Sequence, residues 1–400
     1  MNTSFADIEK KENRKDLIIS ICVFLSGFSC FAQLYYFQPL LPDLAKDFIL
    51  SASESSFAIS FSTLGMVFGL FTTMFVADRI PRKKMIGTGL LSSSIFSVAA
   101  SFSPTFLPLI LLSAAKGFLL SGATSVSMAY IAEEVSSRNK GKIMGLYIAG
   151  NALGGMAGRV ISSWIGALYT WRIASVSIGL ICALFAILFL LFSPRSTNFM
   201  PRKESFHTLI IANLQLITSK ALIPFYLTGG LILGVFVSLY NYLGFYLTKA
   251  PFNFPEHYIH YIYLMYIFGI FGSIATAGLT RYFTHFKVLK AMFLVAGILL
   301  LYITDFRVVT LGLAVFTFNF FVVHVLCNRI VSDYNLSKRS VTISIYLLTY
   351  YLGSSLLGWG TGVILDTWGW QYFLGSLILI LLINYGIVIG GIKRMRADLS

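Results

Sequence analysis

Twelve apolar stretches make up most of the chain. Their lengths are close to or above the ~20 residues that a helix needs to cross a bilayer. We expect membrane-spanning helices at 17–39, 53–77, 85–103, 106–131, 143–168, 173–193, 221–248, 258–280, 288–304, 308–332, 341–365 and 371–392. The pattern predicts an all-α polytopic membrane protein. It excludes a soluble enzyme, a secreted disulfide-bonded domain and a disordered regulator, because none of these keeps so much apolar surface from water. With 57% hydrophobic and 12% charged residues, the composition agrees.

The distribution of Lys and Arg predicts the orientation, because these residues collect in cytoplasmic loops. With both ends of the chain inside, 24 of the 30 basic residues fall in cytoplasmic segments and four in outer loops. The other two, Lys116 and Arg159, lie inside helices. This asymmetry explains the net charge of +14 without a nucleic-acid partner. We expect both termini to be cytoplasmic.

The second half of the sequence repeats features of the first. A shift of 199 residues places Gly154 on Gly353 and Trp171 on Trp370. We therefore expect a cytoplasmic tail at 1–16, a six-helix bundle at 17–193, a cytoplasmic linker at 194–220, a second six-helix bundle at 221–392 and a tail at 393–400. Parallel repeats of this kind place a substrate site near the midplane between the halves, as is typical of transporters.

A charged segment, DRIPRKK at 78–84, follows the second predicted helix. A carboxylate and several cations at this position can latch the inner ends of two bundles together, although an ordinary basic loop is the alternative. The segment resembles the helix 2–3 loop motif of the major facilitator superfamily, G-x-L-x-D-R-x-G-R-K. The matching residues are Asp78, Arg79, Arg82 and Lys83. Met74 and Pro81 replace the two glycines of the motif.

The fourth predicted helix carries a buried charge. The sequence of this helix from Ser113 to Gly117 is similar to the R-x-x-Q-G motif of the superfamily. The end of the helix is similar to the A-Y-x-A-E-E sequence found in the YnfM-type subgroup of proposed exporters. The matching residues are Gly117, Tyr130, Glu133 and Glu134, while Ser113 and Lys116 replace the Arg and the Gln. A charge at the centre of a helix costs about 2.5–3.5 kcal/mol on insertion scales. Lys116 is therefore expected to face a cavity, with a structural cation as the alternative.

Glycines recur every four residues in the fifth predicted helix, at 150, 154 and 158, which lets another helix approach closely. The run resembles the antiporter motif G-x-x-x-G-P-x-x-G-G. Gly150, Gly154 and Gly155 match it, and Asn151 stands in place of the Pro. The resemblance implies export by antiport, with these four residues taking part in the conformational switch. Arg159 follows in the same helix and can bind an anionic group or a carbonyl.

None of the sixteen acidic residues falls in the middle of a predicted helix, whereas Lys116 and Arg159 do. We therefore expect a neutral or anionic substrate rather than a quaternary ammonium compound. Further polar residues occur on the helices that line the cavity in the superfamily. These candidates are Gln33, Tyr36, Gln38, Tyr240, Asn241, Asn319, His324 and Asn328. For each, a hydrogen bond between helices is the structural alternative.

The resemblance to the drug:proton antiporter-like branch implies a secondary active transporter of the plasma membrane, expected to be bacterial and monomeric. We expect a proton-linked exporter of a small organic solute or xenobiotic, working by alternating access. The candidates for proton coupling are Asp43, Glu133, Glu134 and His324. An importer or facilitator on the same fold is the alternative, and a polytopic membrane enzyme is a remote one. We expect no catalytic residue, cofactor, metal site or nucleic-acid partner.

Overall fold

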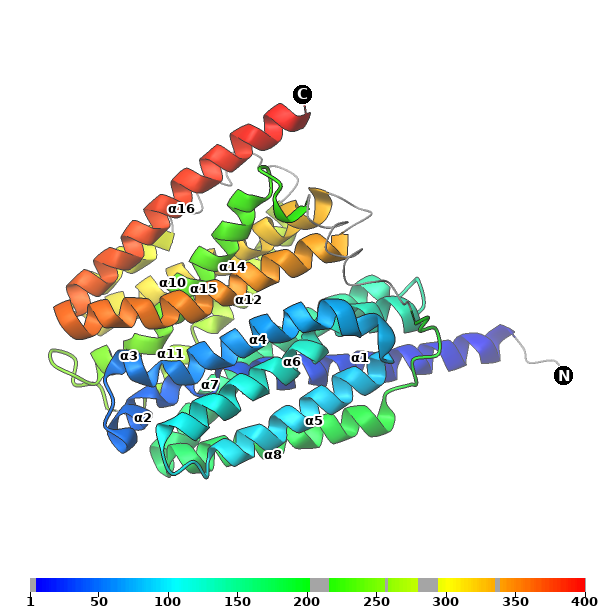
Figure 1. Ribbon diagram of the computed structural model, residues 1–400, viewed down its shortest axis with the longest axis horizontal. Coiled ribbons are helices and arrows are strands. Elements are labelled where there is room, and N and C mark those ends of the chain that lie inside the picture. The colour runs from blue at the N-terminus through cyan, green and yellow to red at the C-terminus, as the bar shows by residue number, and fades with distance from the viewer. Residues whose placement is uncertain (1–4, 202–215, 256–257, 280–293, 335–338, 400) are drawn as a thin grey trace.

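The computed structural model describes residues 5–201, 216–255, 258–279, 294–334 and 339–399 (Figure 1). The described residues form helices, turns and connecting loops and contain no strand. They make two bundles that lie side by side, one containing α1 to α8 and the other α10 to α16 (Figure 1). The all-α class predicted from the apolar stretches is confirmed.

The N-terminal bundle, called the N-half below, contains six long helices. They are α1 (Phe5–Tyr35), α4 (Phe57–Val76), α5 (Arg82–Ala100), α6 (Phe106–Glu134), α7 (Lys140–Leu168) and α8 (Trp171–Phe192). Short elements join them: η1 (Gln38–Leu40), α2 (Leu41–Phe48), α3 (Ala52–Ser55) and η2 (Ala77–Arg79). The break after α1 coincides with Pro39 and Pro42, which lack the backbone N–H that a continuous helix needs.

The C-terminal bundle, called the C-half, repeats this plan. Its helices are α10 (Ile223–Leu247), α11 (His260–Tyr263), α12 (Tyr266–Leu279), α14 (Phe306–Tyr334), α15 (Arg339–Trp368) and α16 (Trp370–Leu399). Residues 294–299 are helical and lead into η4 (Leu300–Tyr302). The start of the ninth predicted helix, 288–293, and the centre of the predicted linker, 202–215, lie outside the described residues.

Some boundaries differ from the sequence prediction. Helix α1 begins at Phe5 and α16 continues to Leu399, so most of each predicted tail prolongs a helix. The eighth predicted helix is divided into α11 and α12 at Leu264–Met265. There the backbone bonds run from Leu264 N to Tyr261 O and from Met265 N to Ile262 O, three residues back instead of four. The chain is therefore wound more tightly at this point than in an α-helix.

Eight stretches of the described chain are long and apolar enough to cross a membrane, among them Trp171–Phe192 and Ile223–Leu247. Helices α5 and α7 are long but less apolar, because they carry Lys, Ser and Gly residues. Helix α12 is described for only 14 residues. Together with the ninth segment, these helices account for the twelve predicted spans.

The internal repeat is visible in the helix boundaries. Helices α7 and α15 begin at Lys140 and Arg339, and α8 and α16 begin at Trp171 and Trp370. Both pairs of starting points are 199 residues apart, the same offset as in the sequence. The two halves therefore have the same order of helices, which confirms the expected parallel repeat.

The glycine stripe of α7 packs against α1. A Cβ atom on Gly150 would lie 2.5 Å from the carbonyl oxygen of Phe24, and one on Gly154 would lie 2.2 Å from that of Phe28. In the C-half, a Cβ on Gly353 of α15 would lie 2.0 Å from the carbonyl oxygen of Gly230 on α10. Only a residue without a side chain permits such close approach of two backbones.

The halves meet at the end of the molecule that carries α2 and α3. Here α15 packs on α3 and α4, α10 packs on η1 and α2, and both α11 and α12 pack on α7 (Figure 1). We call this the outer end, following the orientation predicted from the charges. The opposite end carries η2, the start of α5 and the end of α6, and is called the inner end.

Candidate functional site

Arg159 of α7 lies where the two halves meet and is only 2% exposed. Its Nε donates to Oε1 of Gln38 at 2.5 Å, and its Nη1 donates to the carbonyl oxygen of Gly155 at 2.5 Å. Its Cζ lies 4.4 Å from the ring centroid of Tyr35 in α1 and 4.5 Å from that of Tyr266 in α12. Within the described chain, no carboxylate forms an ion pair with it. Arg159 is therefore a buried cation held by aromatic rings and neutral oxygens.

The amide of Gln38 links Arg159 to the C-half. Its Nε2 donates to Oδ1 of Asn241 at 2.7 Å and to the carbonyl oxygen of Val237 at 3.2 Å, both in α10. Gln38 and Asn241 are each 1% exposed. An unpaired buried amide destabilises a protein, so this chain of bonds favours the conformation in which the two halves are in contact.

Serine and threonine residues make a second connection between the halves. The hydroxyl of Ser355 in α15 donates to the carbonyl oxygen of Ser60 in α4 at 2.8 Å, and it lies 2.8 Å from the hydroxyl of Thr63. Nearer the outer end, the backbone N–H of Ser53 donates to Oδ2 of Asp366 at 3.0 Å. These bonds fix α15 against α3 and α4.

Lys116 of α6 lies inside the N-half. It is 1% exposed, and its Nζ is 4.4 Å from the ring centroid of Tyr36 and 4.9 Å from that of Phe37. The ammonium forms no ion pair or hydrogen bond with any described residue. Both rings belong to the outer end of the first predicted helix, so Lys116 packs against that helix.

Gln33 and Tyr36 of the N-half also direct their polar atoms into that half. The hydroxyl of Tyr36 lies 2.8 Å from that of Ser175 in α8. Gln33 donates to Ser29 at 3.2 Å and accepts from Ser97 of α5 at 3.2 Å. These contacts are hydrogen bonds between helices within the N-half.

His324 and Asn319 lie on α14 of the C-half. Nδ1 of His324 is 3.0 Å from the hydroxyl of Tyr346, and its ring centroid is 4.6 Å from that of Tyr350. Asn319 donates from Nδ2 to the carbonyl oxygen of Val315 at 2.7 Å. His324 therefore lies in an aromatic environment.

The residues around Arg159 and His324 belong to one continuous aromatic cluster, which we call the C-half aromatic cluster. Successive ring centroids are 5.3 Å apart from Tyr266 to Phe236, 3.9 Å from Phe236 to Phe320, and 6.2 Å from Phe320 to His324. Tyr350 completes the cluster beside His324. Thus the cluster connects the cation of the N-half with the imidazole of the C-half.

At the inner end, Arg82 forms the centre of the predicted latch. It is 7% exposed and donates from Nη2 to Asp78 at 2.8 Å and to Glu133 at 3.1 Å, and from Nη1 to the carbonyl oxygen of Ala77 at 2.6 Å. Burial lowers the pKa of Arg82, but the bonds to Asp78 and Glu133 outweigh it, so the pKa lies above its ordinary value. Arg79 points to solvent. These acidic partners of Arg82 are all in the N-half.

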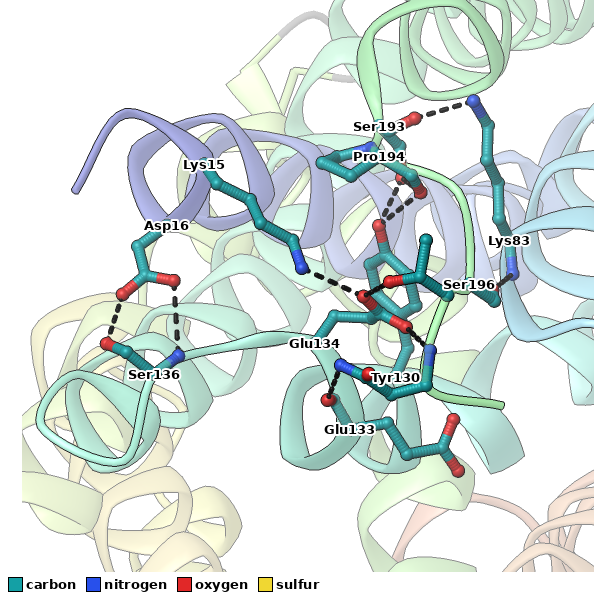
Figure 2. A network of polar contacts seen from close by, with 12 residues as sticks. Lys15, Asp16, Lys83, Tyr130, Glu133, Glu134, Ser136, Ser193, Pro194 and Ser196 are labelled. Carbon is teal, nitrogen blue, oxygen red and sulfur yellow. Dashed lines mark hydrogen bonds and ion pairs between the residues drawn. The ribbon is translucent and has the colours of Figure 1, made fainter. Parts of the chain in front are cut away.

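Glu134 organises the segment that follows α8 (Figure 2). Its carboxylate accepts from Nζ of Lys15 at 2.9 Å, from the hydroxyl of Thr197 at 2.8 Å and from the backbone N–H of Asn198 at 2.7 Å. The side chain of Asn198 in turn donates to the carbonyl oxygen of Glu133 at 2.8 Å. The first residues of the predicted linker are therefore held against α6.

Further bonds hold the same segment. Lys83 donates from Nζ to the carbonyl oxygen of Ser193 at 2.5 Å and from its backbone N–H to the hydroxyl of Ser196 at 2.9 Å. The hydroxyl of Tyr130 lies 2.7 Å from that of Ser193 and donates to the carbonyl oxygen of Pro194 at 2.8 Å (Figure 2). Lys83 and Tyr130 thus join α5 and α6 to the end of α8.

The remaining candidates lie on α7 and near the outer end. Asn151 packs against Gly27 of α1, and Gly155 provides the carbonyl that accepts from Arg159. Asp43 lies in the first turn of α2, half-buried and near Gly166 of α7. The candidates therefore lie at the interface (Arg159, Asn241), within the N-half, on α14 of the C-half (Asn319, His324) and at the inner end, with Asp43 at the outer end.

The sequence prediction did not identify several residues of the interface, above all Tyr35, Tyr266, Ser355 and Asp366. Four tyrosines occur within the nine residues from Tyr258 to Tyr266, and this unusual density was the available signal. A hydroxyl such as that of Ser355 gives no such signal. Its role depends on which helix of the other half lies beside it.

Comparisons with known proteins agree with this architecture. The family model of the Major Facilitator Superfamily matches residues 20–358. An uncharacterized transporter of Buchnera aphidicola (subsp. Schizaphis graminum) is 31% identical over 380 residues, covering 94% of this chain and 91% of that protein. The inner membrane transport protein YnfM of Escherichia coli is 31% identical over 371 residues, covering 91% and 88%.

Among solved structures, a bacterial homologue of the human lysosomal transporter Spinster, in an inward-facing and unoccupied conformation, has a TM-score of 0.79 at 13% identity, covering 96% of this chain and 98% of that one. The D-xylose–proton symporter has a TM-score of 0.74 at 14% identity, covering 92% and 97%. At these low sequence identities, the similarity to the two solved structures shows a shared fold alone. With two six-helix repeats, a family match over most of its length and transporters as relatives, the chain belongs to the Major Facilitator Superfamily and is a multi-pass membrane transporter rather than an enzyme.

Proposed function

We propose that the protein is a proton-linked exporter of a small organic solute that is anionic or neutral. The observation that carries this proposal is Arg159, a buried cation at the contact between the halves with no carboxylate partner among the described residues. An unpaired buried charge is costly, and a substrate that supplies a negative charge or a strong acceptor offsets that cost. A cationic substrate would increase it.

Other residues support this assignment. Gln38 and Asn241 offer amide groups beside Arg159, and Lys116 adds a second positive charge within the N-half. In our proposal, Arg159 and Asn241 contact the substrate, while Gln33, Tyr36 and Lys116 hold the N-half in shape around them. We also assign Asn319 and His324 of α14 to the site, because the C-half aromatic cluster connects this helix to Tyr266.

We assign the conformational switch to both ends of the molecule. At the inner end, Arg82 with Asp78 and Glu133 holds the loop between α4 and α5 within the N-half, and Arg79 is exposed and available for the opposite state. At the centre, Gly150, Asn151, Gly154 and Gly155 keep α7 close to α1, so that α7 moves as part of the N-half.

We assign the proton step to His324 in preference to the carboxylates. Glu133 and Glu134 are engaged with Arg82 and Lys15 at the inner end, whereas His324 lies in the interior of the C-half, connected through aromatic rings to Tyr266 beside Arg159. An imidazole can accept a proton at one ring nitrogen and release one from the other, as a proton carrier must. Asp43, at the outer end, is the second candidate.

The test uses everted membrane vesicles whose interior is acidified by respiration and which contain a fluorescent pH indicator. Organic anions, neutral solutes and quaternary ammonium compounds are added in turn to the outside, which is the cytoplasmic face. The proposal predicts that particular anions or neutral solutes release protons from vesicles with the protein, but not from control vesicles. It predicts no such release by the ammonium compounds.

The variants Arg159→Gln and His324→Gln should abolish proton release by the same solutes. Release by quaternary ammonium compounds alone would contradict the assigned substrate charge. Solute movement into the cell that accompanies protons would contradict the direction and identify an importer on this fold.

A further inference from the structure

The guanidinium of Arg159 has hydrogen-bonding capacity that the protein does not use. Its Nε and Nη1 donate to Gln38 and Gly155, but Nη2 forms no hydrogen bond within the described chain. A carboxylate is the acceptor that best matches this group, because its two oxygens fit the planar N–H groups of an arginine.

Tyr266 provides a second unused donor at the same place. Its ring centroid lies 4.5 Å from Cζ of Arg159, and its side chain is 4% exposed. Its buried hydroxyl has no hydrogen-bond partner among the described residues. Buried hydroxyl groups are normally satisfied, so an unpaired one beside an unpaired arginine points to an acceptor that arrives from outside the protein.

The walls around these donors are aromatic. Tyr35 packs against Arg159 from α1, and Tyr240 lies beside Tyr266 with ring centroids 4.9 Å apart. The C-half aromatic cluster continues from Tyr266 through Phe236 and Phe320. Aromatic side chains pack well against the flat ring of a ligand, in stacked or edge-to-face arrangements.

Arg159 and Tyr266 belong to different halves, and this explains how a buried site is reached. These two residues touch in the closed arrangement, so separation of the halves at the outer end would part them and expose both. Their approach then encloses whatever is bound between them. Ligand binding and closure of the outer end are therefore coupled through the same pair of side chains.

We propose that Arg159 and Tyr266 bind the carboxylate of an aromatic carboxylic acid, and that the C-half aromatic cluster packs against its ring. The inference rests on the proposed function and names the substrate class of that site. A small monocyclic acid such as benzoate is the simplest ligand with these two features.

The experiment measures equilibrium binding of radiolabelled benzoate to the purified full-length protein in nanodiscs. Benzamide, which keeps the ring but loses the charge, should compete at least about tenfold more weakly, because hydrogen bonds to charged groups are the strong ones. Cyclohexanecarboxylate, which keeps the charge but loses the aromatic ring, should compete roughly threefold to tenfold more weakly.

Three variants test the residues themselves. Arg159→Gln should abolish saturable binding, and Arg159→Lys should weaken it about tenfold, because a lysine cannot form the paired bonds. Tyr266→Phe should weaken it roughly fivefold by removing one donor. The control Arg329→Gln, which removes an exposed arginine of α14 paired with Asp333, should bind benzoate like the parent protein.

The proposal is overturned if benzamide competes as well as benzoate, or if Arg159→Gln and Tyr266→Phe bind benzoate normally. Size-exclusion profiles and thermal unfolding show whether each variant is folded, and Tyr266→Phe keeps the ring that supports Arg159. If vesicles exchange protons for another solute and benzoate neither binds nor competes with it, this inference fails while the proposed function stands. If benzoate binds through Arg159 but no solute releases protons, the proposed function fails instead.

Discussion

Gln38 of the N-half and Asn241 of the C-half are joined by a hydrogen bond of 2.7 Å. Gln38 also accepts from Arg159, so one amide connects the buried cation of one half to the opposite half. Both amide groups are almost completely buried. A bond of this kind exists only while the halves are in contact at this end, and in the proposed transport cycle we assign it to the outer gate.

Loss of this bond should open the outer end more often. The variant Asn241→Leu removes one inter-half hydrogen bond, worth about 1 kcal/mol, which corresponds to a roughly fivefold shift of the conformational equilibrium. Spin labels are attached at Ile49→Cys and Trp368→Cys, two exposed positions near the outer end. Double electron–electron resonance then measures the distance between the labels. The four native cysteines are buried and give a low background. An unchanged distance distribution would contradict the assigned gate.

The contact between α1 and α7 should tolerate no side chain at Gly154. In Gly154→Ala the Cβ would lie 2.2 Å from the carbonyl oxygen of Phe28, so the helices must separate, at a cost of about 1–3 kcal/mol. At Gly145 of the same helix nothing lies within 4 Å. Gly145→Ala should therefore leave stability unchanged or raise it by up to about 1 kcal/mol. Thermal unfolding compares the two variants, and equal effects would disprove the packing argument.

Arg82 and Arg79 should differ in their effect on stability. Arg82→Ala leaves Glu133 without its cation and should lower the free energy of unfolding by about 2 kcal/mol or more. Arg79 is exposed, so Arg79→Ala should change stability by less than about 0.5 kcal/mol. Chemical denaturation in detergent measures both. If Arg79→Ala is stable but impairs proton release from vesicles, its role belongs to the opposite conformation.

The bond between Glu134 and the start of the linker should control local opening. In Glu134→Gln the carboxylate that accepts from the backbone N–H of Asn198 loses its charge, and its ion pair with Lys15 disappears. Hydrogen exchange of the Asn198 amide should become at least about tenfold faster, since bonds to charged groups contribute about 1.5–3 kcal/mol. Asp333→Asn, at an exposed ion pair, should not alter exchange at Asn198. Equal exchange in Glu134→Gln and the parent protein would show that Glu134 does not hold the start of the linker.

The sequence predicted the fold well because long apolar segments and loop charges follow from the bilayer itself. Trp171 and Trp370 mark equivalent helix starts, and their 199-residue offset is already readable in the sequence. The division of the eighth helix at Leu264 was not predicted, because its tighter winding leaves no apolar or polar signal.

The candidate site was harder to predict. Because charged residues are rare inside the predicted helices, Lys116 and Arg159 could be identified from the sequence as the two cations there. The sequence could not show that Lys116 packs within the N-half while Arg159 contacts the C-half. Gln33 and Gln38 are only five residues apart, yet one bonds within its half and the other across the interface. These differences depend on the rotation of each helix, which only the packed structure provides.

The most direct measurement of the central claim is a comparison of solutes inside and outside cells that produce the intact protein or Arg159→Gln, each with and without a protonophore. We expect that an organic solute, anionic or neutral, leaves cells faster only with the intact protein and only while the proton gradient is present. Accumulation of that solute inside the cells, or equal export by Arg159→Gln, would contradict it.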